Sequence, residues 1–178
     1  MADLLPLQSE RIILRRLSPN DLAAFQAYRH DPDVGLYQGW TPQTDAEALA
    51  FIHEMASALP FLPGNWLQLG IADRQTNLLI GDVGLFVAAD GQSAGIGFTL
   101  CAQAQGRGLG SEAVSLAVKL LFQNTSVACI EGITDARNFA SIKLLERIGM
   151  RRMATLSAVF NNEPCLEHTY AISRSDCD

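Results

Sequence analysis

The sequence predicts an α+β fold in which a mixed, mostly antiparallel, twisted sheet carries helices on both faces. The strand-like and helical segments follow one another as strand, two helices, three strands, helix, strand, helix and two strands. Short polar turns join several of the strands, which is typical of antiparallel pairs. A glycine-rich loop at residues 104–113 separates a strand from a helix. The two strands flanking that helix should therefore run parallel, because a helical crossover joins parallel strands.

The N-terminal half is predicted to hold two helices between strands. Each helix begins at a capping box, with Ser18 and Asp21 at the first and Thr44 and Glu47 at the second. The first helix should reach about residue 28, and the second should end before Pro60. The strands are apolar runs bounded by polar or glycine-containing turns, at residues 11–17, 66–73, 78–87 and 95–102.

The C-terminal half is predicted to alternate helices and strands. A helix at 109–122 carries its apolar residues on one face, and a second helix at 138–148 stops at Gly149. Strands are expected at 129–134, 151–160 and 166–172, the last two joined by a turn at 161–164. We find no repeat or interdomain linker, so residues 1–178 are expected to form a single domain.

Composition narrows the functional classes. The chain is 48% hydrophobic and 18% charged, which is typical of globular proteins. Its net charge of −6 argues against a nucleic-acid partner and favours neutral or cationic substrates. Neither a membrane-spanning run nor a basic signal-peptide flank is found, so we expect a cytoplasmic protein with no membrane partner. The histidines are isolated and the cysteines widely spaced, so we expect no metal and free thiols at Cys101, Cys129, Cys165 and Cys177.

The glycine-rich loop is the strongest functional signal. Gly106, Gly108 and Gly110 allow backbone N–H groups to point into one concavity, and the following helix adds its unpaired N–H groups and positive dipole end. An anionic ligand such as a phosphate is predicted. Ser111 and Glu112 follow the last glycine where a nucleoside-triphosphate loop needs Lys and then Ser or Thr, so that class is excluded.

A dinucleotide-binding fingerprint is a second alternative for the same loop. Residues 108–113 fit G-x-G-x-x-A, and Glu131 lies at roughly the expected spacing of about 20 residues. That fingerprint opens a doubly wound sheet, yet here it lies past the midpoint of the chain. Too few residues follow it to build the rest of such a sheet, so NAD binding is not expected.

Four segments carry a family resemblance. Residues 105–110, Gln-Gly-Arg-Gly-Leu-Gly, resemble the Q/R-x-x-G-x-G/A loop that binds acyl-CoA pyrophosphate in the GNAT superfamily of N-acetyltransferases. Residues 9–15 and 31–34 resemble its ribosomal-protein (RimJ/RimL-like) branch. Residues 138–150 are similar to the branch's N-x-x-S…L-E-x-x-G-F segment, with Met150 where Phe is usual. The resemblance covers about residues 8–172.

This resemblance implies that acetyl-CoA lies as co-substrate in a V between splayed strands, here 95–102 and 129–134. Its pantetheine arm would pair with backbone near Leu100 and Ala102 and contact Asn138. The pyrophosphate would lie on the N–H groups of the loop. The implied cofactor-binding residues are Leu100, Ala102, Gln105, Gly106, Arg107, Gly108, Leu109, Gly110, Ser111, Asn138 and Ser141.

The resemblance also implies direct attack of an amine on the acetyl carbonyl, with the oxyanion held by a backbone N–H on a bulged strand. Ser141 or Tyr170 would protonate the departing thiolate, and the residues do not decide between them. Asn138 also fits a helix N-cap, and Tyr170 also fits the core. No general base identifies itself, since the candidate carboxylates also fit surface charges: Asp82, Glu163 and Glu167.

The acceptor site is expected between the first two helices and the final hairpin, with Tyr37, Trp40 and Phe160 as wall residues. The acceptor is a primary amine, and branch resemblance places a protein N-terminus, such as that of a ribosomal protein, first. A polyamine, an amino acid or an aminoglycoside is an alternative acceptor. A non-catalytic acyl-CoA sensor is an alternative to an enzyme. The sequence does not decide acyl-chain preference, or between a monomer and a homodimer.

Overall fold

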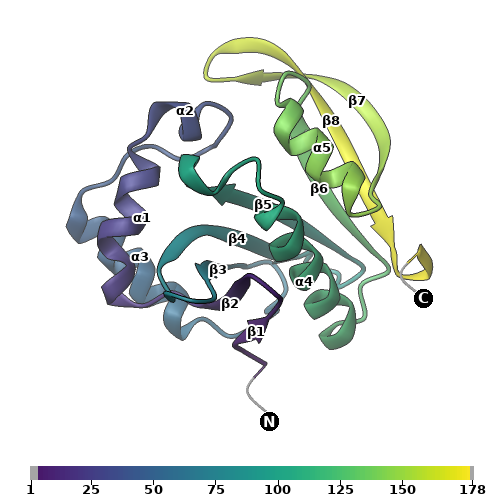
Figure 1. Cartoon of the computed structure of the whole chain (residues 1–178). Coiled ribbons are helices and arrows are strands. Elements are labelled where there is room, and N and C mark those ends of the chain that lie inside the picture. The colour runs from purple at the N-terminus through teal and green to yellow at the C-terminus, as the bar shows by residue number, and fades with distance from the viewer. Residues whose placement is uncertain (1–3, 177–178) are drawn as a thin grey trace.

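A computed structural model describes residues 4–176. In this part of the chain one eight-stranded sheet forms in the order β1-β2-β3-β4-β5-β6-β8-β7, and every neighbouring pair is antiparallel except β5 and β6 (Figure 1). The predicted fold class is confirmed. The strands are β1 (Leu7–Gln8), β2 (Ile12–Arg16), β3 (Trp66–Asp73), β4 (Leu79–Val87), β5 (Ser93–Leu100), β6 (Cys129–Asp135), β7 (Arg151–Phe160) and β8 (Glu163–Ser173).

Helices cover both faces of the sheet. On β4, Asp82 contacts Tyr28 of α1 while the next residue, Val83, packs in the core that contains α4. Because neighbouring strand residues point to opposite faces, α1 and α4 lie on different faces. Both capping boxes form, at Ser18 and Thr44. The helices are α1 (Leu22–Arg29), α2 (Pro32–Gly35), α3 (Asp45–Ser57), α4 (Leu109–Asn124) and α5 (Phe139–Arg147), with 3-10 turns at Pro19–Asp21, Ala102–Ala104 and Arg174–Asp176.

The predicted parallel pair forms and then splays. β5 and β6 pair over only three positions, from Ser93 with Cys129 to Gly95 with Glu131. β5 continues to Leu100 and β6 to Asp135 without further pairing between them. The sheet thus opens into a V, with α1 and α2 on one side and α5, β7 and β8 on the other (Figure 1).

The end of β5 and the start of β8 differ from the predicted boundaries. β5 ends at Leu100, and Ala102 lies in a 3-10 turn closed by hydrogen bonds to Cys101 and Ala102 carbonyls. The last hairpin turns in two residues, Asn161 and Asn162, which have φ values of 51° and 63°. Asparagine tolerates such positive φ values, and a two-residue turn of this kind matches the twist of a hairpin. β8 therefore begins at Glu163, three residues before the predicted start.

Cys101, Cys129 and Cys165 are free thiols, whereas Cys177 lies outside the described residues. Among residues 4–176, no helix has the length and apolar character needed to cross a membrane.

Candidate functional site

The glycine-rich loop has the backbone conformation that its glycines permit. Gly106 and Gly108 have φ values of 71° and 80°, and Gly108 is the N-cap of α4. The N–H groups in the first turn of α4 have no partner within the helix. A Cβ on Gly110 would lie 2.7 Å from Leu144 Cδ1 and 3.2 Å from Leu100 Cδ1. The loop therefore forms a close-packed concavity of orphan donors at a helix N-terminus, which suits an anion.

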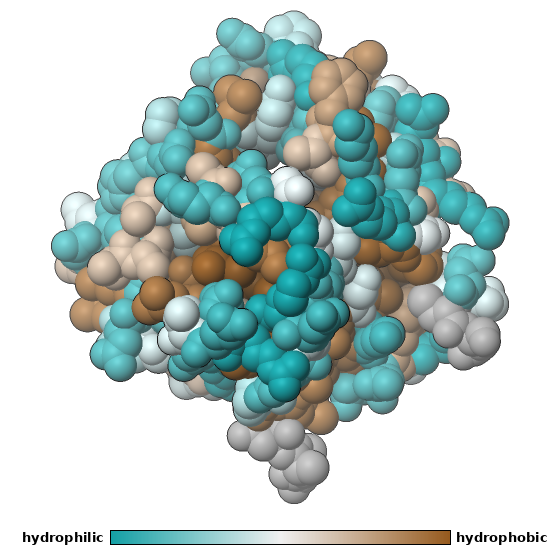
Figure 2. Space-filling view, viewed as in Figure 1, coloured by the Kyte–Doolittle hydropathy of each residue, from teal (hydrophilic) through white to brown (hydrophobic). Residues whose placement is uncertain are grey.

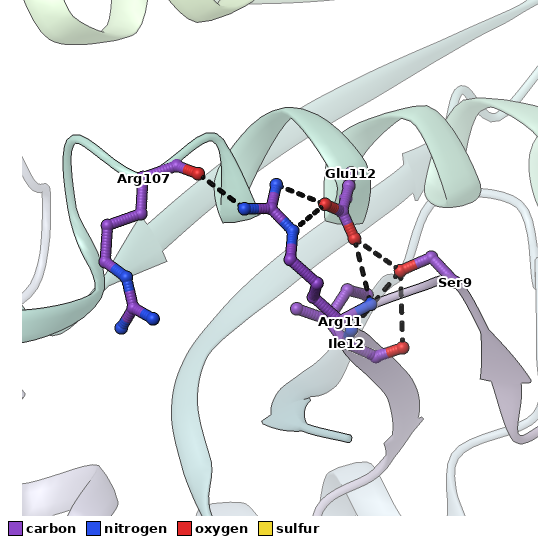
Figure 3. Close-up of polar contacts among 5 residues, drawn as sticks. All are labelled: Ser9, Arg11, Ile12, Arg107 and Glu112. Carbon is purple, nitrogen blue, oxygen red and sulfur yellow. Dashed lines mark hydrogen bonds and ion pairs between the residues drawn. The ribbon is translucent and has the colours of Figure 1, made fainter. Parts of the chain in front are cut away.

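A network of polar contacts among Ser9, Arg11, Glu112 and the Arg107 carbonyl, here called the Arg11–Glu112 network, holds this loop against the start of β2. The Arg11 guanidinium donates to Glu112 and, through Nη1, to the Arg107 carbonyl oxygen at 2.9 Å (Figure 3). Ser9 Oγ donates to Glu112 Oε2 at 2.7 Å. These contacts join the start of β2 to the loop and to the first turn of α4. Sequence reasoning missed Arg11 and Ser9, because their partner lies about a hundred residues away in the chain.

The surroundings of the Glu112 carboxyl favour its ionised form. Partial burial raises the pKa of its carboxyl, but the hydrogen bonds from Ser9 and Arg11 and the Arg11 charge outweigh burial and lower the pKa below its usual range. A negative charge in the first turn of a helix is also favoured by the dipole. Glu112 therefore anchors the loop.

A cavity of about 620 Å³ lies beside the loop. Its walls come from the end of β5, the loop, one side of α5 and the segment around α2. Lys143 and Arg147 line it and bring positive charge close to the orphan N–H groups. In the space-filling view, hydrophilic side chains gather where α4 begins, and a band of hydrophobic ones lies on the α1 side (Figure 2). Predicted residues that line this cavity are Leu100, Gln105, Gly106, Gly108, Gly110, Ser111, Asn138, Ser141 and Tyr37.

A second, smaller cavity of about 120 Å³ lies inside the V. Ile96–Phe98 of β5 form one wall and Gly132–Asp135 of β6 form the other. Phe160 and Glu167 also line it. It adjoins the larger cavity, since both are lined by Tyr37, Gln38, Phe98, Asn138 and Ser141.

The backbone at the end of β5 differs from what the resemblance implied. Gln105 Nε2 donates to the Leu100 carbonyl oxygen at 2.9 Å, and Gln38 Nε2 donates to the Phe98 carbonyl oxygen at 3.4 Å. β5 pairs with β4 in unbroken register, so the implied bulge is absent from this pairing. The nearest register shift lies between β3 and β4, at Ile71 and Ala72.

Asn138 and Ser141 lie where both cavities meet. Asn138 Oδ1 accepts a hydrogen bond from the Ser141 backbone N–H at 3.1 Å, so Asn138 is the N-cap of α5. Within residues 4–176, neither Asn138 Nδ2 nor Ser141 Oγ makes a hydrogen bond. The capping geometry therefore leaves one amide donor and one hydroxyl available at the junction.

The structure places the other predicted residues away from the larger cavity. Tyr170 is 1% exposed, and its hydroxyl donates to Glu146 Oε1 at 3.0 Å. Burial and Glu146 together raise the pKa of that hydroxyl. Trp40 Nε1 donates to the Arg29 carbonyl oxygen, and its ring stacks on the Arg29 guanidinium at 4.1 Å. The predicted residues that line neither cavity are Ala102, Arg107, Leu109, Trp40 and Tyr170.

The three carboxylates considered as bases are in different environments. Asp82 is 1% exposed, so its interpretation as a surface charge is wrong. Its carboxylate accepts hydrogen bonds from Tyr28 and from Gln68 and Arg29, the last two at 2.6 Å and 3.0 Å. Glu163 is exposed at the hairpin, whereas Glu167 lines the small cavity. No group of three potential metal ligands is found within residues 4–176.

Comparison with known proteins identifies the class that this fold and site define. Residues 11–151 match the family model of the acetyltransferase (GNAT) domain, so the chain belongs to the GNAT family and is an acetyltransferase. The structure forms the glycine loop on which the sequence resemblance partly depended and the splayed strands that the resemblance implied, and the predicted family is confirmed.

Among curated proteins, the chain is 29% identical over 151 residues to the uncharacterized N-acetyltransferase p20 of Bacillus licheniformis, covering 84% of each chain. Two solved structures share the fold. One is a RimL ribosomal L7/L12 alpha-N-protein acetyltransferase in complex with coenzyme A, at 15% identity and a TM-score of 0.79, covering 96% of this chain and 97% of the other. The other is spermidine N-acetyltransferase from Vibrio cholerae with CoA and spermine, at 19% identity, a TM-score of 0.80 and 94% and 98% coverage.

Proposed function

We propose that the protein moves the acetyl group of acetyl-CoA directly to a primary amine. The observation that carries this proposal is the junction at α4, where orphan N–H groups of a glycine loop adjoin a cleft between two splayed strands. An acyl-CoA has the matching parts, since its pyrophosphate is an anion and its pantetheine arm is narrow and extended. The structural neighbours named above are described as complexes with CoA.

Each part of the cleft takes a role in this proposal. The N–H groups of residues 106–111 bind the pyrophosphate, and Lys143 and Arg147 add positive charge. Asn138 Nδ2 donates to the pantetheine arm. Ser141 Oγ donates a proton to the departing thiolate, and it is favoured over Tyr170 because Ser141 lines both cavities.

For the acceptor we propose the N-terminal amine of a protein. The RimL-type structural neighbour is described as acting on such an amine. Tyr37 and Phe160 line the small cavity and would hold the residue that carries the amine. A polyamine is the second candidate, favoured by the carboxylates of the small cavity and by the spermidine N-acetyltransferase neighbour.

The proposed function is tested by measuring thiol release from acetyl-CoA with three acceptors: a peptide with an N-terminal serine, spermidine and kanamycin. We expect thiol release that depends on an added amine, together with an acetylated product by mass spectrometry. If acetyl-CoA binds and no amine raises its slow hydrolysis, the protein is an acyl-CoA sensor and the proposal is wrong.

The role of Ser141 is tested with Ser141→Ala. We expect turnover to fall by roughly tenfold or more with little change in the acetyl-CoA Kd, because a general acid acts on the transition state. Ser115→Ala on α4 is a matched control, since Ser115 lines neither cavity. Undiminished turnover in Ser141→Ala would remove Ser141 from the mechanism.

A further inference from the structure

The small cavity has charge of one sign. Its charged lining side chains are two carboxylates, those of Asp135 and Glu167, whereas the larger cavity beside the glycine loop is lined by two cations, Lys143 and Arg147, and one carboxylate, Asp33. An anionic donor and a cationic acceptor are therefore drawn to opposite sides of the junction at Ser141. We propose that Glu167 binds the incoming ammonium in the small cavity and accepts its proton before attack, an inference that rests on the proposed acetyl transfer.

Glu167 is the carboxylate with free oxygen atoms. Asp135 faces it directly across the β6–β8 pairing. The Asp135 carboxylate is occupied by Arg137, which donates through Nε at 2.9 Å and through Nη2 at 2.7 Å. Glu167 is half-buried, and its carboxylate makes no hydrogen bond or ion pair with the other described residues. A half-buried carboxylate with no partner favours the approach of a cation.

The dimensions of the cavity suit an amine head group. The volume of about 120 Å³ is several times the space that one water molecule requires. It is small compared with the volume of about 620 Å³ of the larger cavity. Its apolar walls include Ile96, Leu145 and Phe160. Asn138 and Ser141 line this cavity as well as the larger one, so an amine inside it lies next to the position proposed for the thioester.

The Glu167 carboxylate takes one proton from R–NH₃⁺ and later releases it to water. The neutral nitrogen forms a C–N bond to the acetyl carbonyl carbon, and the C–S bond breaks with its electron pair on sulfur. The second nitrogen proton reaches that sulfur by way of Ser141 Oγ, so the products are the amide, CoA thiol and one released proton.

The alternatives for this role are less well placed. Asp82 lies on the face of β4 that packs against α1, and its carboxylate is enclosed by Tyr28, Arg29 and Gln68. Glu163 is exposed at the hairpin turn and lines neither cavity. The titratable groups around Glu167 are Asp135 and Arg137 at the end of β6, Tyr37 across the cavity, and its neighbour His168, whose Nδ1 is hydrogen-bonded to Thr155 Oγ1.

The test compares Glu167→Gln with Glu163→Gln, a control on the same strand. Each variant is titrated with acetyl-CoA and assayed across pH with the best acceptor from serine peptide, spermidine and kanamycin. We expect Glu167→Gln to keep the wild-type Kd for acetyl-CoA and to lose about 100-fold in kcat/KM at neutral pH. The loss should shrink as the pH rises through the pKa of the acceptor amine, because an increasing fraction of the amine is then already neutral. Glu163→Gln should match wild type.

The possible results are distinguishable. Equal kcat/KM in the two variants overturns the role of Glu167 while leaving acetyl transfer intact. A loss in Glu167→Gln that is constant with pH also overturns it, because a merely structural defect does not depend on the protonation of the amine. Failure of the wild-type protein to acetylate any of the three amines overturns the proposed function itself.

Discussion

Two networks of charged side chains hold the parts of the cleft in place. The Arg11–Glu112 network supports the glycine loop on one side of the sheet. On the other side Asp82 joins α1 to β3 and β4, and Arg29 of the same network is stacked against Trp40 near the predicted acceptor wall. Neither network touches the junction at Ser141. Their role is to fix elements whose backbone lines the cavities.

The lowered pKa of the Glu112 carboxyl predicts a pH-dependent contribution to stability. Between the folded pKa and the ordinary value of 4.5 the unfolded chain binds more protons, so the free energy of unfolding rises with pH there. The contribution is present above about pH 4.5 and is lost as the pH falls through the folded pKa. Glu112→Gln should cost roughly 1 kcal/mol at pH 7, since Arg11 is partly exposed.

Urea unfolding of wild type and Glu112→Gln from pH 3 to 7 tests this prediction. The difference between them should narrow as the pH falls through the acidic range. A difference that is constant over the whole range would contradict the assignment of Glu112 as an ionised anchor.

The buried Asp82 predicts a larger effect. Asp82→Asn leaves the Arg29 charge, whose side chain is 13% exposed, without its counter-charge, and breaking a buried pair in this way costs about 3–5 kcal/mol. Chemical denaturation measures the loss. Asp90→Asn, in an exposed turn, is the control and should change the free energy of unfolding by less than about 0.5 kcal/mol. Equal small effects in both variants would show that the Asp82 network contributes nothing.

At the scale of elements, the start of α5 combines a structural and a functional role. Asn138 caps the helix through its oxygen and has its amide nitrogen free for a ligand. Asp caps as well as Asn but lacks the amide donor. The two roles of one side chain can therefore be separated by substitution.

Asn138→Ala should lower the free energy of unfolding by about 1 kcal/mol, through loss of the cap. Asn138→Asp should restore that stability but still bind acetyl-CoA more weakly than wild type, by roughly tenfold. Thermal unfolding and calorimetric titration of both variants provide the measurements. Wild-type affinity in Asn138→Asp would mean that Asn138 acts only as a cap.

The elements were predictable where their signals are local. The capping boxes at Ser18 and Thr44 form as expected, because each depends on residues three positions apart. The end of β5 was not predictable, since the apolar run continues into Cys101 and Ala102 although the backbone turns there. Pro164 is typical of a turn, yet it lies in β8. At Pro164 this strand pairs with β7 but not yet with β6, so the β6-facing edge is unpaired. The missing N–H of proline costs nothing on that unpaired edge.

At the scale of the whole molecule, the site is built from segments distant in sequence. The glycine loop and the Asn138 segment were recognisable because each is a contiguous motif. The contact of Arg11 with Glu112 and the position of Glu167 in the small cavity have no local signal, since the packing of α4 on β2 creates the first and the pairing of β6 with β8 creates the second. For the same reason the sequence could not show that Tyr170 and Trp40 point away from the larger cavity.

The proposed function requires the glycine loop beside the V to bind acetyl-CoA. Calorimetric titration of Gly108→Val with acetyl-CoA tests this binding, because Gly108 has a φ of 80° and a Cβ there would lie 3.3 Å from Arg11 Nη2. Gly91→Val, at a φ of 70° in a distant turn with nothing within 4 Å, controls for backbone strain alone. We predict micromolar binding in wild type and Gly91→Val and its loss in Gly108→Val. Equal acetyl-CoA affinity in all three proteins, or no binding to wild type, would show that the glycine loop does not bind acetyl-CoA.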